Sequence, residues 1–274
     1  MWKVEPMNRG AGVPAPEPVG IRDFFAMFRG KAFKPTMILL YAALALSIWR
    51  YIPPAPHLVD PRATAAFVAA NGLAAPSADV SESTDSGWIP FFRGETRIFA
   101  AFVVMGLIPA LMVRFVFREK LSDYGVRFGN RFTVRSLLIF TPVMILLGYL
   151  ASFNGDFATI YPYNPHAADS RLRFILHAAL FFGLYYTAWE FMFRGFMLRG
   201  LSDSCGMFNA VLIAALASAM LHYGHPLTEV LGAVGGGVFW GLLAFRTRSI
   251  LSGAIQHAVL GISLDFFLVS TFLR

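Results

Sequence analysis

Long apolar runs alternate with short polar connections along most of the chain. A helix needs roughly 20 such residues to cross about 30 Å of hydrocarbon. Seven runs come close to this length, with ends defined to within several residues: near 35–53, 97–117, 136–153, 174–198, 207–223, 229–245 and 250–272. The pattern therefore predicts an all-α fold, a polytopic transmembrane helix bundle of about seven spans.

The charges between the runs predict the topology. Residues 1–34 contain six basic residues, as does the stretch 114–135 around the connection between the second and third runs, whereas the long loop at 54–95 contains two basic and five acidic ones. Basic residues stay preferentially on the cytoplasmic side of a membrane. We therefore expect a cytoplasmic N-terminus and an outer loop at 54–95, either a small lid or a partly ordered connector.

Composition excludes several classes of protein. Hydrophobic residues make up 57% of the 274 residues and charged residues 14%, whereas soluble domains carry about 25% charged residues. Cys205 is the only cysteine, which excludes a secreted disulfide scaffold. The formal net charge of +7 fits cytoplasmic loops that face anionic lipid. We expect membrane lipid, and no nucleic acid, among the partners.

Glycines are concentrated in the sixth run, with small-xxx-small spacings at 232/236 and 237/241. Such spacing lets two helix backbones approach closely. We interpret these glycines as packing residues rather than catalytic ones.

Ionisable residues inside the predicted spans are candidates for function, because a carboxylate in hydrocarbon is costly unless it is paired or protonated. Among the acidic residues, only Glu190 and Asp265 lie well inside predicted spans. Three histidines, His222, His225 and His257, lie at or within the fifth and seventh spans. These few residues are the candidates for chemistry within the membrane.

Glu190 has a predicted partner in Arg194, which follows at i+4 on the same helix face. One interpretation is a structural ion pair that holds helices together. The other adds two histidines from two further helices: the carboxylate takes a proton from water, and an imidazole positions that water or stabilises an oxyanion. The residue types allow both.

Other proteolytic chemistries lack their motifs. The sequence has no HExxH, no GxSG serine turn and no paired aspartates with GxGD. Zinc held by Glu190, His222 and His257 would fit a catalytic site with three N/O ligands and an open position. Nothing in the spacing demands a metal, and no cofactor is expected.

Three short motifs carry a family resemblance: "WEFMFRG" around Glu190, "SAMLH" ending at His222 and "HAVLG" starting at His257. They resemble the CPBP (ABI) family of CAAX-protease and bacteriocin-processing intramembrane glutamic endopeptidases, whose pattern is EExxxR, FxxxH and HxxxN or HxxxD on three helices. The resemblance covers roughly residues 174–272. It divides the chain into a cytoplasmic N-terminal segment at 1–34, N-terminal transmembrane helices with the outer loop at 35–153, and a CPBP-like catalytic transmembrane region at 154–274.

Three positions depart from the family pattern. Trp189 stands where the family has its first Glu, the catalytic base. Ser218 stands at the Phe position, and Gly261 replaces the Asn or Asp that would help form the oxyanion hole. We expect the helix to be turned so that Glu190 takes the place of the base; the alternative is an inactive relative.

Three further residues are assigned supporting or structural roles. His225 is a rival to His222, but its place before Pro226 favours a loop at the outer face. Glu229 is expected to cap the next helix. Asp265 lies eight residues beyond His257, about 12 Å along a helix, and is a supporting residue without a direct bond to it.

The resemblance implies an intramembrane endopeptidase that hydrolyses a peptide bond in a membrane-associated protein or peptide. Its expected roles are Glu190 as general base held by Arg194, His222 positioning the water, and His257 stabilising the oxyanion. The rival is a non-catalytic membrane scaffold or transport component with a buried polar network. Prenylated proteins, bacteriocin leaders and sorting tails are not distinguished as substrates. A bacterial inner membrane is the expected location.

Overall fold

The computed structural model describes residues 21–26, 28–51 and 87–272, and in these ranges all regular structure is helical. Most of the expected outer loop 54–95 and of the segment 1–34 lies outside the described residues. The long uninterrupted helices are α2 (Phe33–Tyr51), α7 (Arg131–Ala151), α13 (Leu227–Thr247) and α14 (Leu251–Phe272). Shorter ones are α1 (Ile21–Ala26), α8 (Gly155–Ala158) and α12 (Met207–Met220). The predicted all-α helix bundle is confirmed.

Two long helical passes are built from pieces that alternate between α- and π-helical hydrogen bonding. The first contains α4 (Trp88–Gly94), α5 (Thr96–Ala101) and α6 (Ile108–Leu111), with π-helical stretches at Phe102–Leu107 and Met112–Val116. The second contains α9 (Arg171–Leu180), α10 (Thr187–Glu190) and α11 (Leu198–Cys205), with π-helical stretches at Phe181–Tyr186 and Phe191–Met197. π-helical turns occur often at functional sites. The second pass, which carries Glu190, is therefore a candidate location for the functional site.

Among the described residues, five helical segments are long and apolar enough to cross a membrane: Gly30–Trp49, Trp88–Val116, Arg131–Ala151, Leu227–Thr247 and Leu251–Ser270. The expected fourth span falls in the pass from α9 to α11, which contains charged residues, and the expected fifth corresponds to the shorter apolar helix α12. Large apolar side chains project outward from α7, where Leu138 is 72% exposed. The chain is thus a polytopic membrane protein, while the count of seven and the cytoplasmic N-terminus stay predictions.

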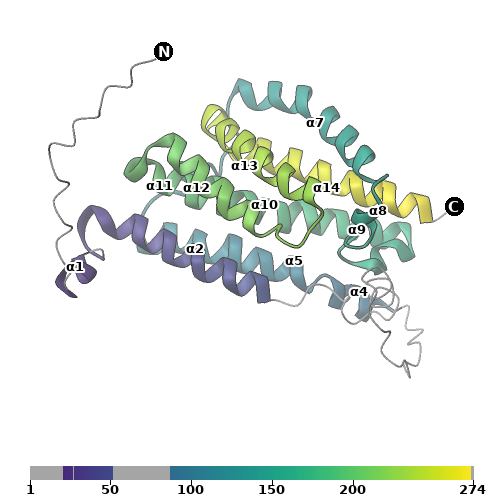
Figure 1. The fold of residues 1–274 in the computed structure, drawn as a ribbon, viewed down its shortest axis with the longest axis horizontal. Helices are drawn as coiled ribbons and strands as arrows, with labels where there is room; N and C mark the ends of the chain where they lie inside the picture. The colour runs from purple at the N-terminus through teal and green to yellow at the C-terminus, as the bar shows by residue number, and fades with distance from the viewer. Residues whose placement is uncertain (1–20, 27, 52–86, 273–274) are drawn as a thin grey trace, which may run out of the picture.

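The helices run roughly along the long axis of the molecule (Figure 1). In that view α2 and α5 lie on one side and α7 on the other, with α10 to α14 between them. Helix α14 packs along α7, and α12 packs along α13. The central position of α10 and α14 encloses the residues they carry.

Glycines make the close contact between α12 and α13. A Cβ at Gly237 would lie 2.8 Å from the Cβ of Ala215, and one at Gly241 would lie 3.1 Å from Val211. The packing role is therefore confirmed at 237/241. Gly232, by contrast, has no neighbour within 4 Å, so the 232/236 spacing does not mark a helix contact among the described residues.

Polar contacts join loops at one end of the bundle. Lys34 donates to Glu119 at 2.9 Å, and the Tyr124 hydroxyl donates to the same carboxylate. Burial alone would raise the pKa of Glu119, but these two hydrogen bonds and the lysine charge hold it below its usual value. Nearby, the Asn130 amide donates to the Arg246 carbonyl at 3.0 Å. The segments expected at the cytoplasmic face therefore meet.

Aromatic rings at i, i+4 spacing cover one face of the central pass. Phe181 stacks on Tyr185 with ring centroids 4.7 Å apart, Tyr185 on Trp189 at 5.8 Å, and Trp189 contacts Phe193 at 5.0 Å. All four side chains are buried in the main core. This packing sets the rotation of the helix and thereby fixes where the neighbouring Glu190 points.

Candidate active site

Glu190 is a completely buried carboxylate at the centre of the bundle. Its Oε1 lies 2.9 Å from Nδ1 of His257 and 3.1 Å from a guanidinium nitrogen of Arg194. The i+4 pairing with Arg194 expected from the sequence is thus present. The other oxygen, Oε2, is buried without a hydrogen-bond partner and lies against α14 at Gly253. The carboxylate is therefore held through one oxygen only.

His257 is oriented by its bond to Glu190. A carboxylate accepts hydrogen bonds, so Nδ1 of His257 donates and Nε2 is left for other contacts. The imidazole stacks on Trp240 at 4.5 Å between ring centroids and contacts Tyr186 at 4.7 Å. This arrangement, a buried acid orienting an imidazole, is one used for proton transfer in hydrolases.

Trp189 occupies the space next to both motif histidines. Its ring lies 5.5 Å from that of His222 and 6.3 Å from that of His257. Its indole Nε1 is buried without a hydrogen-bond partner. Within the described residues, no hydrogen bond or ion pair joins His222 to Glu190. The structure thus brings Glu190, Arg194 and His257 together. His222 is not in this group, and its ring contacts the Trp189 indole instead.

His222 belongs to a second polar cluster with His225 and Glu229. Nδ1 of His225 lies 2.9 Å from Oε1 of Glu229, and Nε2 of His222 lies 3.9 Å from the same oxygen. Nδ1 of His222 lies 3.0 Å from the Ser218 carbonyl. The expected loop position of His225 is confirmed, in the turn before Pro226. Glu229 lies in the first turn of α13, as expected, where a negative charge is favoured, and its carboxylate also pairs with His225.

A tyrosine from the loop after α7 completes this cluster. The hydroxyl of Tyr161 donates to Oε1 of Glu229 at 2.7 Å. Burial, together with Tyr163 and the charge of Glu229, raises the pKa of Tyr161 well above its usual value. The hydroxyl therefore keeps its proton and its role as donor. The Oε2 atom of Glu229 is buried without a partner, like that of Glu190.

Asp265 contacts a third group of ionisable residues. Its Oδ2 lies 3.5 Å from Nε2 of His177, and Nδ1 of His177 lies 2.8 Å from Oε1 of Glu95. The Asn164 amide also donates to Oε1 of Glu95, at 2.6 Å. All four residues are buried. Asp265 therefore has a partner on another helix rather than His257, and Glu95 lies inside the bundle rather than in the outer loop where the sequence pattern placed it.

Tyr186 fills the space beside Gly261. A Cβ built at Gly261 would collide with the Tyr186 hydroxyl oxygen. The position where the family pattern has Asn or Asp therefore has no room for a side chain, and a phenolic hydroxyl lies there instead. A hydroxyl can donate a hydrogen bond as an amide does, so Tyr186 can replace the donor missing at Gly261.

The described residues include no group of three or more His, Cys, Asp or Glu side chains placed to hold a metal ion. Of the three residues considered as zinc ligands, Glu190 and His257 are in contact, and the Trp189 indole lies next to both His222 and His257. Polar groups at the site instead face one another in acid–imidazole pairs.

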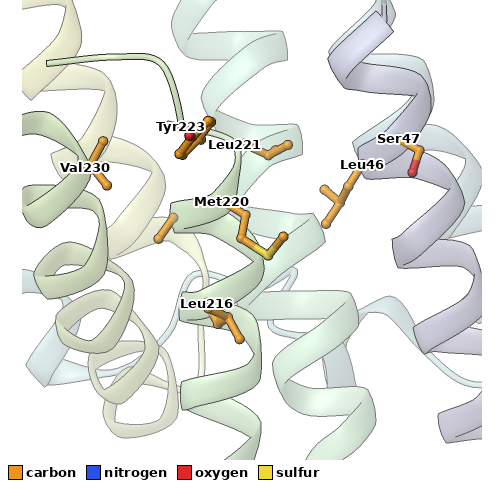
Figure 2. Close-up of a pocket in the computed structure, with 8 residues that line it drawn as sticks. Leu46, Ser47, Leu216, Met220, Leu221, Tyr223 and Val230 are labelled. Carbon is orange, nitrogen blue, oxygen red and sulfur yellow. The ribbon is translucent and has the colours of Figure 1, made fainter. Parts of the chain in front are cut away.

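An apolar cavity of about 530 Å³ lies between α2 and the α12–α13 turn. Figure 2 shows Leu46 of α2 and Met220 of α12 on opposite sides of it. None of the candidate catalytic residues lines the cavity, but Leu221 and Tyr223, the two neighbours of His222 in the chain, do. The cavity therefore adjoins the His222 cluster rather than Glu190.

Several residues of the site could not be found from the motifs. The sequence gives no signal for Tyr161 or for Tyr186, since their partners are distant in the chain. The pairing of Glu229 with the histidines does have a signal in the sequence, because this carboxylate follows two histidines closely in "HYGHPLTE". Glu229 follows His225 by four residues, a spacing that favours a side-chain pair where the chain is helical.

Comparisons with known proteins bear on this same region. Residues 170–262 match the family model described as type II CAAX prenyl endopeptidase Rce1-like. No curated protein and no solved structure matches the chain. The matched segment contains Glu190, His222, Glu229 and His257. The resemblance that the three motifs indicated is thereby confirmed for residues 170–262, which are fewer than half of the chain and are similar to the Rce1-like CAAX-protease family.

Proposed function

We propose that the protein is an intramembrane endopeptidase that cleaves a peptide bond near the end of a membrane-associated protein or peptide, using water activated by glutamate and histidine. The observation that carries the proposal is the buried Glu190 carboxylate, bound through Oε1 by His257 and Arg194 while Oε2 has no partner. The Rce1-like match supports a prenylated CAAX-type substrate. The basic loops of the chain fit a bacterial inner membrane.

The proposed roles follow from which atoms are already engaged. Oε2 of Glu190 takes the proton from water, because Oε1 already accepts a hydrogen bond from His257 and forms an ion pair with Arg194. Once His257 carries a proton on both nitrogens, it donates Nε2–H to the oxyanion that forms on the substrate carbonyl. The Tyr186 hydroxyl beside Gly261 is the second donor. We place His222 on the opposite side of the substrate, since the Trp189 indole lies next to it and to His257.

The test compares cells that carry the wild-type protein with cells that carry Glu190→Gln. Glutamine keeps the shape of the side chain but cannot take a proton, so cleavage should fall by about 10²- to 10⁴-fold. Comparison of the two membrane proteomes should reveal at least one protein that retains a terminal segment in the variant. Glu119→Gln is the matched control, since Glu119 is likewise a carboxylate bound by a hydrogen-bond donor and a cation but lies at one end of the bundle, away from the central site.

The rival function is a non-catalytic membrane scaffold, and it is favoured by Trp189 at the position of the family's base. On that hypothesis the acid–imidazole pairs only hold helices together. Glu190→Gln would then change thermal stability without changing any protein terminus. Identical termini in the two proteomes, with both proteins folded, would replace the enzyme proposal with this one.

A further inference from the structure

Glu229 forms a second acid–imidazole group in the matched region. Its Oε1 accepts from the Tyr161 hydroxyl at 2.7 Å and lies 2.9 Å from Nδ1 of His225. Nε2 of His222 lies 3.9 Å from the same oxygen. Tyr161 comes from the loop between α7 and α9, so this group joins two segments that are distant in the chain. Such convergence is more than a helix start requires.

The hydrogen-bond partners fix where the protons lie. A carbonyl only accepts, so Nδ1 of His222 carries a proton and donates to Ser218. Nε2 then faces a carboxylate oxygen. A lone pair and a carboxylate repel, whereas a proton on Nε2 turns the contact into attraction. Burial lowers the pKa of His222 to about 4, and the charge of Glu229 acts against that shift. Glu229 therefore stabilises the imidazolium form when His222 takes up a second proton and becomes a proton donor.

The position of His222 places this proton at the proposed site. The Trp189 indole contacts the rings of both His222 and His257. On the other side, Leu221 and Tyr223 line the apolar cavity between α2 and α12 (Figure 2).

We propose that His222 and Glu229 form the proton-donating half of the active site, with His225 and Tyr161 positioning Glu229. Attack forms a C–O bond between water and the substrate carbonyl carbon, and one water proton passes to Glu190. On collapse, the C–N bond breaks, its electron pair leaves on nitrogen, and His222 supplies the proton that makes that nitrogen an amine. The second water proton leaves with the new carboxylic acid.

The protons balance over one cycle. After the products leave, water that enters the site carries the proton from Glu190 to His222, so both groups return to their starting states. The His222 side chain is 16% exposed whereas that of Glu190 is 0% exposed, so this water reaches the site from the His222 side. The inference rests on the proposed hydrolytic function and assigns a step that Glu190 and His257 do not perform.

The test separates proton donation from water activation by changing the leaving group. One probe is a farnesylated CAAX peptide, whose amine must be protonated to leave. The other is the 4-nitrophenyl ester of the same farnesylated cysteine, whose nitrophenolate leaves without a proton. Glu229→Gln and His222→Gln should lower peptide cleavage by roughly 10²-fold and ester cleavage by less than about threefold. Glu190→Gln should abolish both, and the control Glu119→Gln should change neither.

The outcomes distinguish the two proposals. If Glu229→Gln loses peptide and ester cleavage equally, with its thermal unfolding unchanged, the donor role is overturned and the proposed function stands. Full peptide cleavage by Glu229→Gln would likewise overturn the donor role and leave the proposed function standing. Wild-type protein that cleaves neither probe, or Glu190→Gln that cleaves both, would overturn the proposed function and this inference with it. Retained ester cleavage also shows that a variant is folded, so a structural defect cannot imitate the expected result.

Discussion

The carboxylate of Glu190 lies against the backbone of Gly253. A Cβ at position 253 would come within 2.5 Å of Oε2, a separation that real Cβ atoms essentially never show. Gly253 precedes His257 by four residues, about one helical turn. On the same face of α14, Gly253 leaves room for the carboxylate, and His257, one turn later, forms a hydrogen bond with it. Glycine is required here by close approach, since the backbone is helical.

Gly253→Ala should damage the site without damaging the helix. The new methyl group forces Glu190 to move, and the movement lengthens its bonds to His257 and Arg194. Because a small misplacement of catalytic groups can cost about 10²-fold, we expect cleavage of the CAAX peptide to fall at least tenfold. Peptide cleavage by purified protein measures this.

A second glycine substitution provides the control. Gly235 lies in α13 with no neighbour within 4 Å, so Gly235→Ala adds a methyl group in open space and improves helix propensity. It should leave cleavage unchanged. Unchanged cleavage in Gly253→Ala as well would show that the observed placement of Glu190 is not needed for activity.

Local pattern predicted the elements of the site but not their partners. The pair between Glu190 and Arg194 follows from helical spacing alone. Glu95 could not be placed in this way, because its partners Asn164 and His177 are 69 and 82 residues away in the chain. A run of polar residues before it suggested an exposed loop. Burial of this carboxylate depends on contacts that periodicity does not describe.

The central pass shows a second limit of hydropathy. Its run at 174–198 was predicted as a span, yet it is not among the five segments that qualify by length and composition. Glu190 and Arg194 are charged and therefore lower the mean hydropathy of this run. The fold tolerates them because both side chains are buried within the protein. Residues that build an intramembrane site thus weaken the signal by which the span would be recognised.

Tyr186→Phe tests the donor that replaces the side chain missing at Gly261. The substitution removes only the hydroxyl, which lies where a Cβ of residue 261 would be. Loss of one oxyanion donor typically lowers kcat by about 10²- to 10³-fold, and we expect a fall in that range with KM little changed. Steady-state cleavage of the CAAX peptide supplies both constants.

Tyr185→Phe is the matched control for that experiment. Tyr185 is the buried neighbour of Tyr186, and its ring stacks on Trp189 instead of contacting His257. Its hydroxyl has no proposed role, so kcat should be unchanged. Equal losses in the two variants would indicate that the phenolic groups act through packing.

Trp189 should contribute mainly to stability. Its ring is buried and contacts Tyr185, Phe193 and both motif histidines. Trp189→Ala leaves a large cavity and should lower the free energy of unfolding by about 3–5 kcal/mol. Trp189→Phe keeps part of the ring and should lose clearly less. Thermal unfolding in detergent compares the two, and equal stabilities would contradict the packing role.

The buried group around His177 makes the last prediction. Its imidazole lies between Glu95 and Asp265, and removing it leaves two carboxylates buried without a counter-charge. His177→Leu should therefore lower the free energy of unfolding by about 3–5 kcal/mol. His166→Ala, in a partly exposed pair with Asp169, should have little effect, because exposed pairs contribute at most about 1 kcal/mol.

A combined variant separates loss of charge balance from loss of packing. Adding Glu95→Gln and Asp265→Asn to His177→Leu removes both uncompensated charges while keeping the shapes of the side chains. Replacement of a whole buried charge group is often close to neutral, so the triple variant should be more stable than His177→Leu alone. Because the three residues are in contact, their effects should not add. A triple variant less stable than the single one would show that the group contributes through hydrogen bonds and packing rather than through balanced charge.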